Sequence, residues 1–383
     1  MNVLVVFTYN YSLLDWQKTG NLEKELSIYK KLHKLHGVNF FFLTYGDEDD
    51  LKIKIDCEGI KIIPIFHFIK KFSSKKINFL FSFLYPFMIK NQLPEVHLIK
   101  QNQLLGSWIS IILKYLLKVK LFVRTGYDMY LFSREITSKY KSSLYYFLTS
   151  ITVKFADLYS VTSKSDLKFF DEKFPNANVA YRPNWVLNEE YKDIKSRFNN
   201  RLLVVGRLEY QKNISFIISC LKNSPFILDV VGSGSEKDNL DLLAKEYNVK
   251  VNFLGNLDNK ELERIYKKYI FYVSSSLFEG NPKTVLEAMS NGCIVFLSDI
   301  KNHTELVKDS VNGFIFNFKM RDLTNELDKI LDNQPKLNTI SINAFETVKS
   351  NNSFSKLVNI ELTFIQKSIL KRQKRNISFW KHQ

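Results

Sequence analysis

Two glutamates eight residues apart, Glu279 and Glu287, are the side chains of this sequence whose type and spacing most directly indicate chemistry. Asn281 and Pro282 lie between them. Asn is a favoured N-cap residue, and Pro suits the first helical position because the N–H that it lacks would have no partner within the helix. We therefore expect a helix over residues 282–291, with Glu279 on the preceding loop and Glu287 about one turn inside the helix.

The start of this helix is a candidate anion-binding site. The amides of Gly280, Lys283 and Thr284 would point outward from the positive end of the helix dipole. The two flanking carboxylates could accept hydrogen bonds from hydroxyls of the molecule that carries the anion. The pattern indicates a ligand with both phosphates and sugar hydroxyls, which describes a nucleotide sugar. The alternative is an amphipathic helix with a solvated glutamate at each end.

A basic loop upstream would serve the same ligand. Gly206, Arg207 and Lys212 follow the apolar segment 202–205. Arg offers a fixed bidentate fork and Lys a mobile point charge, so together they can neutralise a departing diphosphate without a metal ion. The alternative is that both cations pair with Glu209 at the surface.

Over about residues 202–316, the chain resembles the retaining GT-B glycosyltransferases of family 4. The shared elements are the two acids, the Gly-Asn-Pro-Lys and Leu-Glu-Ala-Met segments, and a Gly-Arg-Leu loop with Lys-Asn downstream. The resemblance implies that Glu279 meets hydroxyls of the transferred sugar and that Glu287 meets the ribose. It assigns diphosphate binding to Arg207 and Lys212, which form the expected catalytic set with Glu279. It also implies transfer with retention of the anomeric configuration.

The donor site implied by this resemblance includes a second glycine loop, residues 230–237, which contains Gly232. The third glycine of a dinucleotide-binding fingerprint is absent from this loop, so a purely structural turn is the alternative. We expect a UDP-sugar in preference to a GDP-sugar, and neither a metal ion nor another cofactor. The expected donor-binding residues are Gly206, Gly232, Gly280, Asn281, Pro282, Lys283, Thr284 and Glu287.

Four residues of the N-terminal half are candidates for the opposite wall of a cleft: Gly20, Asn21, Arg124 and Asp128. Family members often bring backbone amides close to the donor or acceptor in the region of Gly20 and Asn21. Many members also have a His near the position of Arg124, and this sequence has none there. We expect Arg124 to bind phosphate or to form a structural ion pair, and Asp128 to contact the acceptor.

The alternation of short apolar runs with helix-like segments predicts an α/β fold with parallel sheets covered on both faces. The 383 residues are too many for one compact core. The expected architecture is GT-B, with two doubly wound Rossmann-like domains facing a central cleft. The predicted strands span residues 3–7, 39–44, 60–65, 120–124, 158–161, 179–181, 202–205, 226–231, 251–254, 270–274 and 294–297, and residues 103–117 are predicted to be helical. The expected divisions are an acceptor-binding domain (1–184), a linker (185–200), a nucleotide-sugar-binding domain (201–362) and a basic tail (363–383) that could pack back on the first domain.

The net charge of +16 indicates an anionic binding partner or an anionic surface. Residues 70–90 set lysines beside a dense apolar and aromatic stretch, and residues 367–381 form a basic segment with Phe379 and Trp380 near its end. Basic flanks around bulky apolar residues suit an anionic membrane surface, while a helix packed on a core is the alternative. We expect no nucleic-acid partner, because only the charge suggests one and no recognised nucleic-acid-binding motif is present.

Together these features predict an enzyme, a hexosyltransferase-type glycosyltransferase (EC 2.4). It would move a sugar from a nucleotide-diphosphate donor to a saccharide or lipid-linked acceptor in bacterial surface polysaccharide synthesis (lipopolysaccharide, capsule or exopolysaccharide). A nucleotide-sugar epimerase or hydrolase of the same fold is the alternative. Three widely spaced cysteines, no basic leader and no apolar run of about 20 residues favour a cytoplasmic location, peripheral at the inner face of the membrane.

Overall fold

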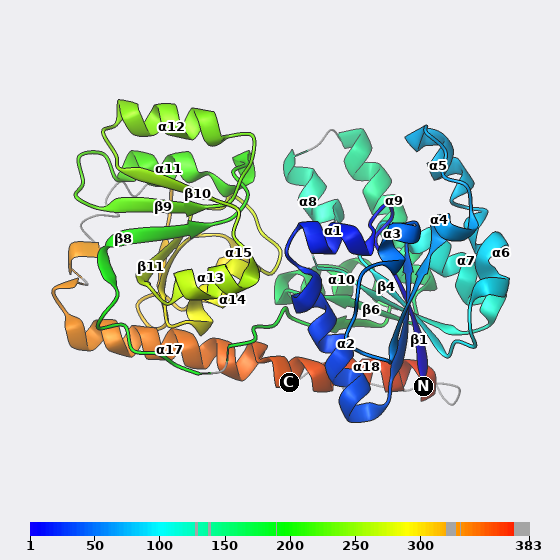
Figure 1. Cartoon of the computed structure of the whole chain (residues 1–383). Helices are drawn as coiled ribbons and strands as arrows, with labels where there is room; N and C mark the ends of the chain where they lie inside the picture. Colours follow the sequence, from blue (N-terminus) through cyan, green and yellow to red (C-terminus); the bar gives the residue numbers. More distant parts are fainter. Residues whose placement is uncertain (127–128, 137–138, 189, 319–326, 330, 371–383) are drawn as a thin grey trace.

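Two parallel β-sheets, each at the centre of its own domain, organise the chain (Figure 1). The computed structural model describes residues 1–370 except 127–128, 137–138, 189, 319–326 and 330. Asp128 and residues 371–381 of the predicted basic segment therefore lie outside the described residues. In both sheets all of the paired strands are parallel and covered by helices, which confirms the predicted α/β class.

The first sheet has seven strands in the order β3-β2-β1-β4-β5-β6-β7. The order reverses beside β1, and ligands of such sheets bind beyond the carboxyl ends of the strands at this switch point. The strands are β1 (Asn2–Val6), β2 (Asn39–Thr44), β3 (Ile60–Pro64), β4 (Leu98–Asn102), β5 (Lys120–Arg124), β6 (Leu158–Val161) and β7 (Val179–Tyr181). The helices are α1 (Leu13–Lys18), α2 (Leu22–His36), α3 (Glu48–Leu51), α4 (Ile65–Phe68), α5 (Lys75–Phe81), α6 (Tyr85–Ile89), α7 (Ser107–Leu117), α8 (Met129–Ile136), α9 (Lys139–Phe155) and α10 (Lys164–Lys173), with a 3₁₀ turn, η1 (Lys90–Gln92).

The second sheet has six strands in the order β10-β9-β8-β11-β12-β13, with its switch beside β8. The strands are β8 (Phe198–Val205), β9 (Ile227–Val231), β10 (Val251–Gly255), β11 (Tyr269–Ser274), β12 (Ile294–Ser298) and β13 (Phe314–Phe316). The helices described in this half of the chain are α11 (Ile214–Cys220), α12 (Lys237–Glu246), α13 (Asn259–Tyr266), α14 (Lys283–Ser290), α15 (Lys301–Thr304), α17 (Gln334–Asn352) and α18 (Phe354–Leu370), the last of which packs on the first domain, with a 3₁₀ turn, η2 (Tyr210–Lys212). None of the described helices combines the length and apolar composition needed to cross a lipid bilayer.

The sequence analysis found most of these strands but missed β4, which is central to the first sheet, and the short β13. β4 contains the polar residues Lys100, Gln101 and Asn102, all buried, so it lacks the continuous apolar run of a buried parallel strand. The helix predicted from Gln103 begins at Ser107 instead, because Gln103 has a left-handed backbone (φ 69°) and ends the strand in a turn.

The chain crosses between the domains twice, and the two crossings are hydrogen-bonded to each other. The N–H of Val186 donates to the carbonyl of Asn352 (2.9 Å), and the Asn352 side-chain amide donates to the carbonyl of Asn184 (2.8 Å). After this point α18 runs along the first domain, whereas α17 runs along the second (Figure 1). The expected boundary after residue 362 falls inside α18, so we propose that α18 belongs with the first domain.

A buried charge cluster fixes α18 to the first sheet. Glu361 of α18 accepts a hydrogen bond from Nε of Arg182 and forms an ion pair with Lys100 of β4, and all three side chains are buried. Burial alone would raise the pKa of Glu361, but the charges of Arg182 and Lys100 outweigh it and hold the pKa at about 2. The polar strand β4 is thus stable in the core because a carboxylate from a distant helix neutralises its lysine.

We predict that Glu361→Gln will destabilise the fold by about 3–5 kcal/mol at pH 7, because it leaves Arg182 and Lys100 buried without a counter-charge. Glu361 has a lowered pKa in the folded state, so its contribution should be complete above pH 4.5 and decrease as the pH falls towards 2. At pH 3 the difference between wild type and variant should be smaller by about 2 kcal/mol. Urea unfolding at both pH values measures this. Gln366→Ala, at an exposed position of the same helix, is the matched control, and equal effects of the two substitutions would contradict the assignment.

Candidate functional site

The loop after β11 presents Glu279 at the carboxyl edge of the second sheet. Its carboxylate accepts hydrogen bonds from Nζ of Lys212, on η2, and from the Ser276 hydroxyl (2.7 Å). Only a tenth of the Glu279 side chain is exposed, so the ion pair with Lys212 is well shielded from water. Lys212 does not pair with Glu209, which accepts hydrogen bonds from Ser235 instead. The structure therefore brings together two of the three predicted catalytic residues.

Behind Glu279 lies a buried histidine that the sequence analysis did not assign to the site. Nδ1 of His303 lies 3.0 Å from the carbonyl oxygen of Ser298, and the Ser298 hydroxyl donates to the carbonyl of Ser276 (2.6 Å). Since a carbonyl only accepts, Nδ1 carries the proton and Nε2 is an acceptor, which has no hydrogen-bond partner among the described residues. Burial lowers the pKa of His303 to about 4, although the charge of Glu279 opposes this shift. The imidazole is therefore neutral at pH 7.

Glu287 lies on α14 and faces the first domain. One carboxylate oxygen is bonded by Nζ of Lys24, from α2, and the other accepts from the Tyr266 hydroxyl (3.2 Å). Burial and the adjacent Glu287 charge raise the pKa of Tyr266 well above its usual value, so this phenol remains a donor. Lys24 is a second residue that the sequence analysis missed. A local signal that could have pointed to Lys24 is its place four residues after Gly20, in the first turn of an amphipathic helix.

The start of α14 differs from the predicted capping. Pro282 has extended backbone (ψ 100°) and occupies the N-cap position without a side-chain cap, so the helix begins at Lys283. Asn281 does not cap the helix, because its side-chain oxygen accepts from the backbone N–H of Asn184 (3.2 Å) and its carbonyl accepts from the Asn184 amide (2.9 Å). Asn281 thus fixes the helix start to the first crossing between domains.

Lys283 and Thr284 lie in the first turn of α14, whose amides have no acceptor within the helix. The Thr284 hydroxyl accepts a hydrogen bond from Tyr272 (2.9 Å), and Nζ of Lys283 lies 2.8 Å from Glu25 on α2. Gly280 is in the loop that leads into this turn. The helix start keeps the features of an anion site, with a positive dipole end and a cation beside it.

Two glycine loops lie beside η2 and pack against each other. A Cβ atom at Gly232 would lie 1.9 Å from the carbonyl oxygen of Gly206, and Gly232 also has a positive φ of 136°. The close approach of the two loops therefore requires glycine at position 232. This agrees with the alternative in which residues 230–237 form a purely structural turn. Arg207 follows Gly206 and is exposed, and no hydrogen bond or ion pair of its side chain occurs among the described residues.

The predicted N-terminal residues have different surroundings. The carbonyl of Gly20 accepts from Asn259 of α13 (2.5 Å), whereas the N–H groups of Gly20 and Asn21 donate to carbonyls in α1. Those two amides are therefore used within the turn. Arg124 is buried, and its guanidinium lies 4.0 Å from Glu25 and 3.3 Å from the Asn184 side-chain oxygen. This matches the structural ion pair that the sequence analysis left open.

Glu25 joins the two walls of the site. Burial raises its pKa, but Lys283 from the second domain and Arg124 from the first outweigh burial and lower the pKa to about 2. Together with the pair of Lys24 and Glu287, this interaction links the start of α2 to the start of α14. The structure thus has its two domains in contact, with Glu287 of the predicted motif at the junction and Glu279 on the loop that leads into α14.

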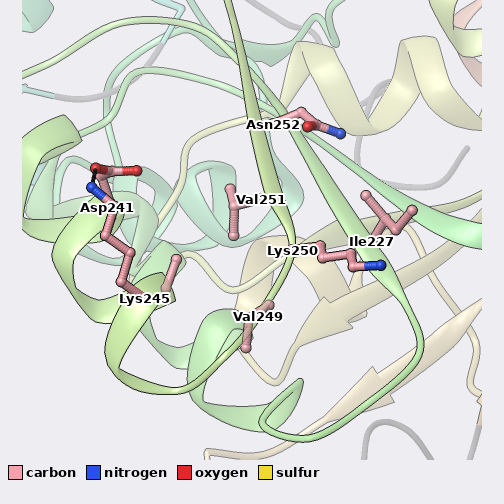
Figure 2. Close-up of a pocket in the computed structure, with 8 residues that line it drawn as sticks. Ile227, Asp241, Lys245, Val249, Lys250, Val251 and Asn252 are labelled. Atoms are coloured by element: carbon pink, nitrogen blue, oxygen red, sulfur yellow. Dashed lines mark hydrogen bonds and ion pairs between the residues drawn. The ribbon is translucent and has the colours of Figure 1, made fainter.

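A hollow elsewhere on the second domain is separate from this site. Figure 2 shows it between α12, with the paired Asp241 and Lys245, and residues 249–252 at the beginning of β10. It therefore lies at the amino ends of the strands, opposite to the edge where ligands of such sheets bind. Among the described residues, no cluster of three or more His, Cys, Asp or Glu side chains is arranged to hold a metal ion.

Residues 189–347 match the family model described as glycosyl transferases group 1, a region that contains both acids and the basic loop. The chain is 36% identical over 121 residues to an uncharacterized glycosyltransferase, MJ1607, of Methanocaldococcus jannaschii, covering 29% of this chain and 30% of the relative. It is 24% identical over 184 residues to an N-acetyl-D-galactosaminyltransferase of Campylobacter jejuni whose name specifies an undecaprenol-linked saccharide, covering 46% of this chain and 50% of the relative. It is 28% identical over 146 residues to the amylovoran biosynthesis glycosyltransferase AmsD of Erwinia amylovora, covering 37% of this chain and 41% of the relative. The matches span half or less of these relatives and support the glycosyltransferase superfamily.

Solved structures resemble the whole chain. Sucrose-phosphate synthase from Thermosynechococcus elongatus superposes with a TM-score of 0.79 at 17% identity, covering 96% of this chain and 99% of that one. HepE of Anabaena, in complex with UDP and glucose, superposes with a TM-score of 0.74 at 16% identity, covering 96% of this chain and 100% of HepE. These likenesses confirm the predicted GT-B fold.

We predict that His303→Gln will remove a specific pH dependence of stability. His303 has a lowered pKa in the folded state, so the unfolded chain takes up its proton first and stability decreases as the pH falls from 6.5 to about 4. Across this window the wild type should lose about 3 kcal/mol more than the variant. Denaturant unfolding at pH 7 and pH 4 measures the difference. His36→Gln, at the exposed end of α2, is the matched control, and parallel profiles of wild type and His303→Gln would contradict the prediction.

Proposed function

We propose that this chain is a group 1 glycosyltransferase that takes a sugar from a UDP-sugar donor. The observation that carries this proposal is the position of Glu279, Glu287 and Lys212 around the start of α14, at the carboxyl edge of the second sheet. The family match over residues 189–347 includes these residues. The UDP present in the similar HepE structure supports uracil as the base of the donor.

In the proposed complex the diphosphate lies between the start of α14 and the basic side chains Arg207 and Lys212. Lys212 is bound to Glu279 in the structure, so an incoming diphosphate competes with Glu279 for the ammonium group. The displaced carboxylate then accepts hydrogen bonds from hydroxyls of the sugar. Glu287 is bound to Lys24 in the same way, and the ribose hydroxyls replace this lysine. The ligand thus replaces two ion pairs within the protein with one ion pair between Lys212 and the diphosphate and with hydrogen bonds from its hydroxyls to the two carboxylates.

The proposed reaction proceeds with retention and without a metal ion. The bond between the anomeric carbon and the diphosphate oxygen breaks, and its electron pair leaves with UDP. Arg207, Lys212 and the helix dipole stabilise the charge that develops on the diphosphate. The acceptor hydroxyl adds to the oxocarbenium-like centre from the same face, and its proton passes to an oxygen of the departing phosphate. The closed junction of the domains excludes water, which would otherwise hydrolyse the donor.

The proposed acceptor is a saccharide or a lipid-linked saccharide bound to the first domain. The C. jejuni relative is described as acting on an undecaprenol-linked saccharide and the E. amylovora relative as acting in amylovoran biosynthesis. On this basis we place the chain in the synthesis of a bacterial surface polysaccharide, on the cytoplasmic side of the membrane. The proposal includes no nucleic-acid partner.

Donor binding tests the site directly. UDP-sugar at one hundred times its Kd should raise the free energy of unfolding by about 2.7 kcal/mol, and a GDP-sugar at the same concentration should have a smaller effect. Lys212→Ala and Glu287→Gln should each weaken binding about tenfold or more, because each removes a charged partner of the ligand. Calorimetry measures the affinities. Lys245→Ala, an exposed lysine of the same domain, is the matched control and should bind like the wild type. Unchanged affinity in both site variants would refute the assignment.

The stereochemistry tests the mechanism. With a UDP-α-sugar and an acceptor saccharide, the product should carry an α-linkage, as read from the coupling constant of its anomeric proton by NMR. Chelation of divalent cations with EDTA should leave the rate unchanged. A β-linked product would rule out retention, and release of free sugar or of an isomerised donor without acceptor would identify a hydrolase or an epimerase instead.

A further inference from the structure

An unusually apolar surface occurs on the first domain, outside the candidate site. In the segment from α5 to α6, residues 75–89, the side chains of Leu80, Phe87 and Met88 are each more than half exposed. Leu84, between the two helices, is exposed to a similar degree. Large apolar side chains that gather in one exposed segment mark an interaction site, whereas isolated ones do not.

The first half of α9 carries two more exposed apolar side chains. Leu144 and Phe147 are 57% and 62% exposed. α7 connects the two parts, because its Trp108 ring packs on Phe79 of α5 (5.4 Å between centroids) and its Ser107 hydroxyl is hydrogen-bonded to Thr152 of α9 (2.7 Å). α5 and the beginning of α9 project from the same end of the first domain in Figure 1. We call the exposed side chains Leu80, Leu84, Phe87, Met88, Leu144 and Phe147 the apolar face.

Lysines surround the apolar face, and acidic residues are missing from its segments. Residues 70–93 contain five lysines and no Asp or Glu, and α9 contains three lysines and no acidic residue. Lys70, Lys71, Lys75 and Lys76 are all exposed. Protein interfaces are depleted in lysine, whereas an anionic bilayer attracts lysines at its surface while apolar side chains enter the headgroup layer. This combination of charge and apolar surface favours lipid over a protein partner.

The apolar face adjoins the edge of the sheet where the site lies. Tyr9 follows β1, the central strand of the first sheet, at its carboxyl end. Its ring contacts Phe79 (6.0 Å between centroids) and Trp108 (5.2 Å), the residues that support α5 and α6. A surface docked on the apolar face would therefore meet the first domain beside the carboxyl edge of its sheet.

We propose that the apolar face and its lysines dock the protein on an anionic lipid bilayer. In this orientation the first domain approaches the membrane with the carboxyl edge of its sheet next to the headgroups. If the proposed function also holds, an acceptor held in the bilayer by a lipid enters the site from this side. Docking itself does not depend on the transfer reaction, so vesicle binding can be measured without donor or acceptor.

Co-sedimentation of the full chain with vesicles tests the proposal. Vesicles of equal parts phosphatidylglycerol and phosphatidylcholine should bind the protein at low salt, whereas vesicles of phosphatidylcholine alone should bind it more weakly. The combined variant L80S/F87S/F147S should lose about tenfold or more in affinity, because three large side chains no longer enter the headgroup layer. K75E/K76E should lose about fivefold or more and show a weaker dependence on salt.

Two controls separate the apolar face from other sources of binding. L242S changes an equally exposed leucine on α12 of the second domain, and it should bind vesicles like the wild type. K371Q/R372Q/K374Q/R375Q removes charge from the C-terminal basic segment. Wild-type affinity in L80S/F87S/F147S, or loss of all binding through the C-terminal variant alone, would overturn the proposal, as would absence of binding to phosphatidylglycerol at low salt. UDP-sugar binding by each variant should be unchanged, so a failure of docking is distinguishable from a failure of the proposed function.

Discussion

Three carboxylates of the candidate site are each neutralised by a lysine, and the site depends on these ion pairs. Glu279 is held by Lys212 within the second domain, whereas the pair of Lys24 and Glu287 and the pair of Glu25 and Lys283 cross the junction. Each of these carboxylates is thus paired with a cation from another element. Of these lysines, Lys212 is the one to which the diphosphate would bind in the proposed complex. In the proposed complex a ligand would therefore bind by an exchange of partners at these ion pairs.

The site is formed by residues of both domains, so it also requires a fixed position of one domain relative to the other. The two crossings between domains are hydrogen-bonded to each other through Asn184 and Asn352, and Asn184 is also bonded to Asn281 at the start of α14. Beyond the second crossing, Glu361 fixes α18 to the first sheet through buried ion pairs. The helix start that would bind phosphate is thus attached directly to the crossings between the domains.

The first domain adds a surface whose position suits the proposed acceptor. Aromatic contacts from Tyr9 through Phe79 and Trp108 connect the carboxyl end of β1 to the helices that carry the apolar face. The lysines near this face also account for part of the high net charge, which the donor site alone does not require. A bilayer at this surface and a nucleotide sugar on the second domain would bring the two substrates to the junction from different sides.

The sequence by itself determined the features that depend on residues close to each other in the chain. The alternation of apolar runs and helical segments predicted two doubly wound sheets, and the spacing of Glu279 and Glu287 around a helix start predicted the donor side of the site. Only the tertiary structure decided which distant residues meet. β4 was missed because its buried Lys100 is neutralised by Glu361 from another part of the chain. Lys24 and Glu25 acquire their partners only when separate elements pack together, His303 comes near the charge of Glu279 in the same way, and Asn281 binds Asn184 instead of capping its own helix. Local patterns reflect hydrogen bonding and burial within one element, whereas a long-range ion pair leaves no periodic signal in either of the segments that form it.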